Sequence, residues 1–369
     1  MVIKKEFHVT EDKAQRRTEL DGLRGVFSLM VVLFHYPENF LPKEVFDFFL
    51  IRESNSFVDF FFVLSGFVIS YNYNSLSSFQ EFWIYLKKRV VRLYPLLFYT
   101  VIVYLAFRLF TFYAFPSLID ATENIAAMMI NTADSLLFTN STPILGSTIA
   151  MNGPSWSISA EMISYVIFGI ICISASKNVR RLLFISITCL SILFLYKQGG
   201  LIKTGDYGFL RGLIAFLIGF FVWELSLNEK RIKDYLQYSI PFLILIFLYI
   251  LHETEETHFG SLFNFTIPFI FGLCILIFIK TKGKITETLN SKPLQFLGKI
   301  SYSLYLNHFL LVTIFPRLIF QVLKVEKNIS TELITFLVII VLCIIYSYFT
   351  QLFIEKAGGK WLKNMLKLS

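Results

Sequence analysis

Three ionisable side chains interrupt an otherwise apolar, membrane-length segment near the start of the chain, DGLRGVFSLMVVLFHY at residues 21–36. Arg24 and His35 are eleven positions apart, so at about 100° per residue they share one face of an α-helix. Asp21 precedes Arg24 by one turn on the same side. Ionisable groups within a membrane helix are costly and usually face a partner, a cavity or a substrate. This stripe therefore predicts a functional site.

The histidine of this stripe is suited to acyl transfer. An imidazole titrates near neutral pH and can take a proton from an acceptor hydroxyl, which is the general-base step of that reaction. Considered alone, His35 better fits an inert, hydrogen-bonded residue at the membrane interface, and its alignment with Arg24 and Asp21 reverses this preference. Arg24 has two interpretations: it orients a carbonyl or phosphate, or it pairs with Asp21 as a structural lock.

The segment VDFFFVLSGF (58–67) places a carboxylate, Asp59, at the start of a second apolar span. We expect Asp59 to hydrogen-bond and orient an imidazole. Ser65 and Gly66 supply a hydroxyl and a position of close backbone approach, as candidates for contact with a cofactor. Their alternative is helix packing, the common use of small residues in membrane helices.

A cluster of cations, KKRVVRLYP (87–95), precedes a third apolar span. Arg89 and Arg92 lie one turn apart at the expected start of a helix. They are candidates for binding an anionic cosubstrate, because paired guanidinium groups match phosphate bidentately. Plain anchoring at the inner membrane surface is the alternative.

The segment GPSWSISAE (153–161) predicts a helix that begins with Pro154, a residue favoured in the first helical turn. Trp156 and Ser157 are candidates for substrate binding, although a tryptophan here also suits an interfacial belt. Glu161 is a catalytic candidate. We expect it in the outer leaflet, with Arg24, Arg211 or a sugar hydroxyl as its partner.

A later segment, GKISYSLYLNHF (298–309), supplies Tyr302, Tyr305 and His308. Tyr302 and His308 are candidates for substrate binding, and filling the core is an equally good interpretation. The histidines of HETEETH (252–258) are six residues apart, whereas a helical zinc pair needs four. We therefore expect no metal site there.

The composition indicates a polytopic membrane protein. Of the 369 residues, 55% are hydrophobic and 16% charged, against about 25% charged in soluble domains. The sequence predicts an all-α bundle with a cytoplasmic arm at 1–20, an integral membrane domain at 21–356 and a basic cytoplasmic tail at 357–369. Ten segments are apolar over membrane-like lengths: 22–38, 57–74, 92–114, 158–175, 180–196, 207–227, 238–252, 262–280, 300–322 and 333–354.

The distribution of cations predicts the orientation. With the N-terminus inside, 24 of the 34 Lys and Arg residues fall on the inner side and only seven on the outer side. This asymmetry follows the positive-inside rule and predicts that both termini are cytoplasmic. The net charge of +8 is thus explained by orientation, and nucleic-acid binding is not expected.

Together these motifs resemble the acyltransferase-3 family of integral membrane acyltransferases, which O-acylate sugars of bacterial surface glycans. The resemblance runs from LDGLRG near residue 20 to the last span near 355. It includes Arg24-x10-His35, VDFFFVLSGF, KRVVRLYP, PSWSISAE and GKISYSLYLNH, all in family order.

This resemblance implies a multi-pass protein of the bacterial inner membrane with a ten-helix core. It implies a cytoplasmic acyl-CoA donor, most commonly acetyl-CoA, as cosubstrate, no tightly bound cofactor, and a glycan or lipid-linked saccharide as acceptor. By the same analogy His35 is catalytic with Arg24 as its partner, Arg89 and Arg92 lie on the CoA side, and Glu161 lies near the acceptor. The short basic tail resembles the stand-alone type, without a hydrolase-like domain.

The predicted donor clamp and His35 lie near opposite membrane faces, roughly 20–30 Å apart at bilayer dimensions. This separation requires either a deep donor tunnel with His35 as base or an acyl-imidazole relay. Two other functions fit the same residues. A transporter would use Asp21, Arg24, Asp59 and Glu161 as a pathway, and a membrane O-acyltransferase of another kind would modify lipid or protein.

Overall fold

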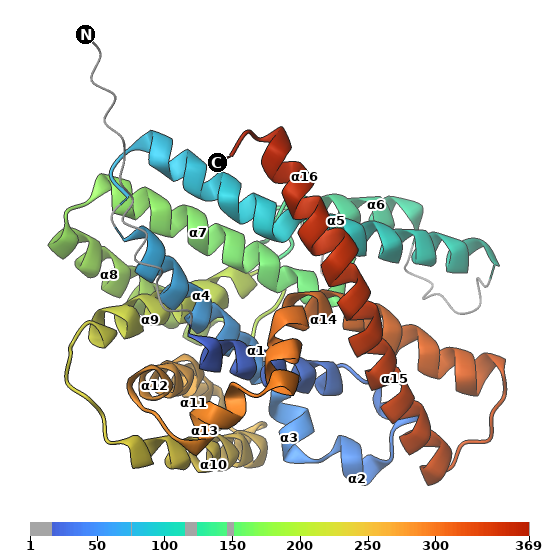
Figure 1. Ribbon diagram of the computed structural model, residues 1–369. Helices are drawn as coiled ribbons and strands as arrows, with labels where there is room; N and C mark the ends of the chain where they lie inside the picture. Colours follow the sequence, from blue (N-terminus) through green and yellow to red (C-terminus); the bar gives the residue numbers. More distant parts are fainter. Residues whose placement is uncertain (1–16, 75, 115–123, 146–150, 369) are drawn as a thin grey trace.

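The computed structural model describes residues 17–74, 76–114, 124–145 and 151–368. The described residues form helices and connecting turns (Figure 1). The α-helices are α1 (Thr18–Phe34), α2 (Lys43–Phe46), α3 (Phe49–Arg52), α4 (Phe57–Tyr73), α5 (Phe79–Ala114), α6 (Ile125–Leu136), α7 (Trp156–Ser174), α8 (Lys177–Lys197), α9 (Gly208–Ser226), α10 (Ser239–Thr254), α11 (His258–Phe263), α12 (Ile267–Lys280), α13 (Lys284–Leu289), α14 (Lys292–Arg317), α15 (Ile329–Thr350) and α16 (Ala357–Met365).

The predicted all-α, multi-pass architecture is confirmed. Nine helical segments in the described part of the chain are long and apolar enough to cross a membrane. They correspond to nine of the ten predicted spans. The remaining one, α1, has 17 residues and is shorter than the roughly 20 residues that a bilayer core requires. It begins at Thr18, inside the predicted arm, and packs mainly against α14.

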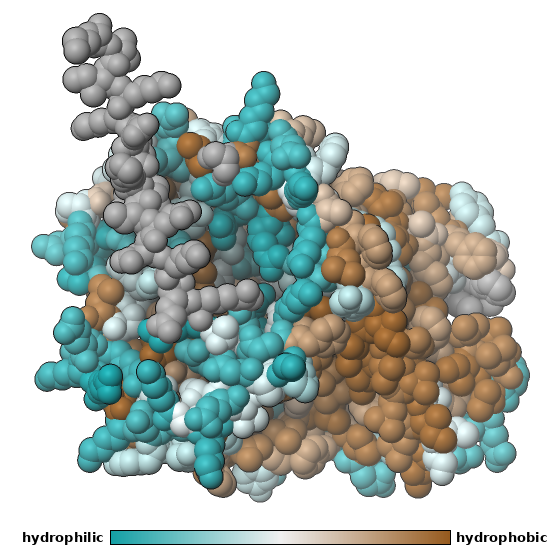
Figure 2. All heavy atoms as spheres, in the orientation of Figure 1, coloured by the Kyte–Doolittle hydropathy of each residue, from teal (hydrophilic) through white to brown (hydrophobic). Residues whose placement is uncertain are grey.

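Hydrophobic side chains gather over one broad face of the molecule, around α15 (Figure 2). Hydrophilic side chains gather on the neighbouring part of the surface, on the left of the same view. Many large apolar residues of the long helices are exposed, including Leu182, Phe242, Ile334 and Phe353. In a membrane protein such residues face lipid, because lipid tails are as apolar as these side chains and contact with them carries no hydrophobic penalty.

Glycines bring two pairs of central helices unusually close together. A Cβ at Gly25 of α1 would overlap the backbone of Gly298 in α14, and a Cβ at Gly298 would overlap the carbonyl of Asp21. In the same way, a Cβ at Gly66 of α4 would overlap the carbonyl oxygen of Phe216 in α9. Small residues allow this backbone approach in lipid, where packing rather than hydrophobicity holds helices together. Gly66 therefore has the packing role, the alternative that its sequence context left open.

The helix start expected at the KKRVVR cluster is wrong. The helix that contains the third predicted span begins well before residue 92: α5 runs unbroken from Phe79 to Ala114, with Pro95 inside it. The KKRVVR cluster consequently lies within a helix rather than at its start. Between α5 and α7, residues Ile125–Leu136 form α6, while 115–123 and 146–150 lie outside the described residues.

Candidate active site

A large cavity runs into the bundle beside the first half of α1. Its volume is about 1150 Å³, more than the 300–1,000 Å³ of typical small-molecule sites. The mouth is lined by residues from segments predicted to be cytoplasmic: cations at Arg17, Lys230, Arg231, Lys280 and Lys282, and acidic residues at Glu19, Glu229, Asp234 and Glu287. The cavity is thus a polar space within the bundle, bordered by segments that the cation distribution predicts to be cytoplasmic.

The walls of the cavity collect predicted site residues from five helices. Arg24 of α1, Ser65 of α4, Arg89 and Arg92 of α5, Ser157 and Glu161 of α7, and Tyr302 of α14 all line it. They are far apart in sequence, so the bundle itself assembles this surface. The structure therefore brings together residues that the sequence assigned to separate donor and acceptor regions, and their individual roles stay predictions.

Arg24 forms an ion pair with Asp21, as the first-turn spacing predicts. The guanidinium Nη1 lies 3.4 Å from the aspartate Oδ1. The Arg24 side chain is 27% exposed and lines the cavity. At 3.4 Å this pair is loose, so the lock and the ligand-orienting interpretations of Arg24 are compatible with each other.

Arg92 is held by a carboxylate that the sequence interpretation did not include. Its Nη1 donates to Oε1 of Glu355 in a short contact, and the other carboxylate oxygen of Glu355 accepts from the Ser303 hydroxyl at 2.8 Å. The guanidinium of Arg92 also lies over the ring of Tyr302. Glu355 stands in a stretch of π-helix, Gln351–Lys356, that follows α15. Such bulges frequently mark functional sites.

Arg89 and Glu161 belong to a second polar group on the cavity wall. Glu161 accepts hydrogen bonds from Ser65 Oγ at 2.6 Å and from the hydroxyl of Tyr165. Arg89 donates to the hydroxyl of Tyr73 at 3.3 Å and lies over the ring of Tyr165. The partners expected for Glu161 were Arg24, Arg211 or a sugar, and Ser65 and Tyr165 replace them. Glu161 therefore faces the same cavity as Arg24 and Arg92.

Asp59 does not orient an imidazole, which corrects the expectation from sequence. Both of its carboxylate oxygens accept hydrogen bonds from Arg211 of α9, the shortest at 2.6 Å. Both side chains are almost completely buried, Asp59 at 0% and Arg211 at 1% exposure. Arg211 also donates to the carbonyl of Asn55 and lies over the ring of Trp156. Trp156 thereby packs against a buried ion pair, and the pair joins α4 to α9.

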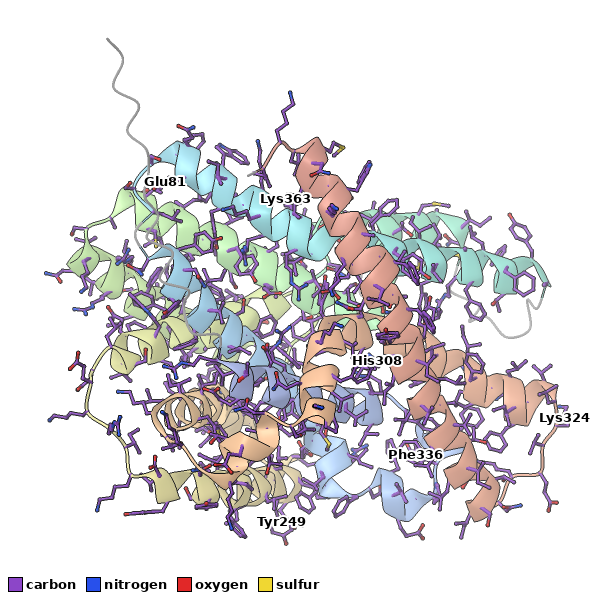
Figure 3. All side chains as sticks on the ribbon, in the orientation of Figure 1. Glu81, Tyr249, His308, Lys324, Phe336 and Lys363 are labelled. Atoms are coloured by element: carbon purple, nitrogen blue, oxygen red, sulfur yellow. The ribbon has the colours of Figure 1, made fainter. Side chains whose placement is uncertain are left out.

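His35 lies at the opposite end of α1, where it is the first residue after the helix. Eleven residues at 1.5 Å per residue separate it from Arg24 by about 16 Å along the axis. His35 is paired with His308 of α14: Nε2 of His308 lies 3.2 Å from Nδ1 of His35. Figure 3 shows His308 in the interior of the bundle, whereas Lys324 and Lys363 lie at its periphery.

Tyr305 contacts both the cavity and the histidine pair. It lines the cavity, and its hydroxyl donates to Ser157 Oγ at 2.8 Å. Its ring centroid is 6.1 Å from that of His308, one turn further along α14. Neither His35 nor His308 lines the cavity, so Tyr305 and its neighbours separate the cavity from the histidine pair.

Metal binding is not indicated in the described ranges, where no cluster of three or more His, Cys, Asp or Glu side chains is arranged to hold an ion. His252 of the HETEETH segment instead faces Glu53, with Nδ1 3.5 Å from the carboxylate.

Comparison with known proteins places this arrangement in a family. The acyltransferase-3 family model, described as an acyltransferase domain, matches residues 17–350. The chain belongs to this family, and it is a multi-pass membrane protein. No solved structure matches it.

Among curated proteins, the chain is similar to two from Staphylococcus aureus. It is 23% identical over 327 residues to "Putative O-acetyltransferase SACOL0978" of strain COL, covering 80% of this chain and 50% of that protein. It is 24% identical over 314 residues to the O-acetyltransferase OatA of strain NCTC 8325, covering 79% of this chain and 49% of OatA. The chain thus spans about half the length of the curated relatives it matches.

Proposed function

We propose that this protein is an O-acyltransferase that moves an acyl group, most simply acetyl, from acyl-CoA to a hydroxyl of a cell-envelope saccharide. Family membership and the names of the S. aureus relatives support the reaction class. The observation that carries the proposal is the arginine-lined cavity, whose lining includes both predicted cytoplasmic segments and Tyr305, a neighbour of the histidine pair.

The cavity suits an elongated, anionic donor. In our proposal Arg24, Arg89 and Arg92 bind the nucleotide phosphates of CoA, the cations of the mouth attract them, and the pantetheine arm extends further into the cavity. Guanidinium groups bind phosphate strongly and bidentately. The thioester then reaches the region of Ser157 and Tyr305, which line the cavity and lie on the side of the histidine pair.

His35 acts as the base in this mechanism. It takes the proton of the acceptor hydroxyl as the oxygen attacks the thioester carbonyl, and the released CoA thiolate then receives that proton. Positioned proton transfer of this kind typically contributes 10²–10⁴-fold. A covalent acyl-histidine relay would use the same residue and would be recognised by label that stays on the protein after rapid quenching without an acceptor.

The test uses inverted membrane vesicles that contain the protein, radiolabelled acetyl-CoA and a total glycan extract. Wild type is compared with His35→Ala, Arg24→Ala and, as a matched control, His258→Ala, which removes an exposed histidine far along the chain. We expect label in a saccharide fraction with wild type and His258→Ala only. Equal labelling by His35→Ala would overturn the proposal. Movement of a saccharide without consumption of acyl-CoA would favour a transporter.

A further inference from the structure

The imidazoles of His35 and His308 form a hydrogen-bonded pair between α1 and α14. His308 is fully buried, and its Nδ1 lies 3.0 Å from the carbonyl oxygen of Leu304. Nδ1 of His35 lies 2.9 Å from the carbonyl oxygen of Val31 and 3.2 Å from Nε2 of His308.

These contacts determine which nitrogen of each ring carries the proton. A carbonyl oxygen only accepts, so the Leu304 carbonyl requires a proton on Nδ1 of His308. A neutral imidazole has one N–H, and Nε2 of His308 is consequently an acceptor. Nδ1 of His35 then faces two acceptors, the Val31 carbonyl and His308 Nε2, and must be protonated. The remaining nitrogen of His35, Nε2, is the basic one.

We propose that His308 is a positioning residue for acyl transfer, which holds His35 in the tautomer and orientation that present an unprotonated Nε2 to the acceptor hydroxyl. This inference rests on the proposed function and adds the residue that prepares its base. A carboxylate commonly has this task in hydrolases. Asp59, the carboxylate expected there, is committed to Arg211.

The pair also matters during the reaction. When the acceptor oxygen gives its proton to Nε2 of His35, the ring becomes a cation that keeps its N–H at Nδ1. That N–H donates to Nε2 of His308, and hydrogen bonds from charged donors are roughly twice as strong as neutral ones. The O–H bond breaks, the new ester C–O bond forms, and the C–S bond to CoA breaks. The proton then passes from His35 to the thiolate, which restores the neutral pair.

The test compares two substitutions of similar size, His308→Gln and His308→Met. Glutamine can offer a carbonyl oxygen to the Nδ1–H of His35, whereas methionine offers only a weak acceptor. We expect His308→Met to lower kcat by about 100-fold or more, within the range of positioned proton transfer. The KM for acetyl-CoA should stay within twofold, because His308 does not line the donor cavity. We expect His308→Gln to recover at least tenfold of the lost kcat.

Each outcome is decisive. A kcat of His308→Met within threefold of wild type, or His308→Gln as impaired as His308→Met at equal abundance and thermal stability, would overturn the positioning role. If neither variant folds, two other experiments replace them: His308→Asn, and acid-quench trapping of label on His35 in the wild-type protein. An acyl-His35 adduct formed at the rate of turnover would overturn the role of His35 as a base. An active His35→Ala would instead defeat the proposed function, so the two failures are distinguishable.

Discussion

Among the arginine–carboxylate pairs that join helices of this bundle, Asp59–Arg211 and Arg92–Glu355 differ in their access to the cavity. Asp59 and Arg211 are sealed between α4 and α9, with side-chain exposures of 0% and 1%. In the pair of Arg92 and Glu355 the carboxylate is 5% exposed, but the arginine is 45% exposed and lines the cavity. The same kind of ion pair thus has two different roles. A sealed pair holds the structure, and an open one leaves a guanidinium available to a ligand.

The sealed pair gives the largest expected effect. Asp59→Asn leaves Arg211 buried beside a neutral amide, and removing one partner of a buried pair typically costs about 3–5 kcal/mol. We expect a large drop in the thermal unfolding temperature in detergent. Replacing both residues, as Asp59→Leu with Arg211→Met, should recover much of the loss, because no uncompensated charge remains. An Asp59→Asn protein as stable as wild type would show that the buried Asp59–Arg211 pair does not hold the structure together.

The difference between the two pairs also explains what sequence could predict. A charge in an apolar span is visible in sequence, and this identified Arg24, Asp59 and Glu161 as unusual. Its partner is not visible, because Asp59 and Arg211 are 152 positions apart and only bundle packing brings them together. Asp59 was therefore assigned to an imidazole, with which it makes no recorded contact among the described residues.

Local spacing predicted what lies within one helix, and helix packing decided the rest. The Asp21–Arg24 pair and the helical opening at Pro154 follow from spacing and residue type. Glu355 was not among the predicted site residues, because the last span was expected to end at residue 354 and Glu355 follows it directly. His35 and His308 are 273 positions apart in the sequence, so their pairing could not be predicted from local spacing. For this reason substrate binding and core filling were equally good interpretations of His308.

The open pair is tested with Arg92→Gln. If Arg92 binds donor phosphate, a lost hydrogen bond between charged groups costs about 1.5–3 kcal/mol, or roughly tenfold to a hundredfold in affinity. We expect the KM for acetyl-CoA to rise by that factor with kcat little changed. Lys87→Gln, an exposed cation of α5 outside the cavity lining, is the matched control.

The double variant Arg92→Gln with Glu355→Gln separates ligand binding from stability. It leaves no orphaned buried carboxylate, so we expect stability close to wild type while the raised KM persists. A KM that returns to the wild-type value in the double variant would mean that Arg92 acts only as the partner of Glu355.

Cations at the mouth should have a smaller effect than Arg92. Lys230 and Arg231 lie on the loop after α9, at the rim of the cavity, where water and salt screen their charges. Changing both to glutamine should raise the KM for acetyl-CoA roughly two- to fivefold at low salt, an electrostatic contribution of about 1 kcal/mol or less. The difference from wild type should shrink in 0.5 M salt. Lys177→Gln, a cation of α8 outside the lining, should leave KM unchanged.

The smallest effect is expected at a third pair, which is open to solvent rather than to the cavity. Nε of Arg181 in α8 donates to both carboxylate oxygens of Glu224 in α9 at 2.7 and 2.9 Å, with the arginine 44% exposed. Exposed pairs contribute only about 0.2–1 kcal/mol, because water solvates the separated charges nearly as well. Arg181→Gln should therefore change neither donor KM nor kcat and should lower thermal stability only slightly. A loss of stability comparable to that of Asp59→Asn would show that burial does not separate these pairs, and that geometry alone determines their strength.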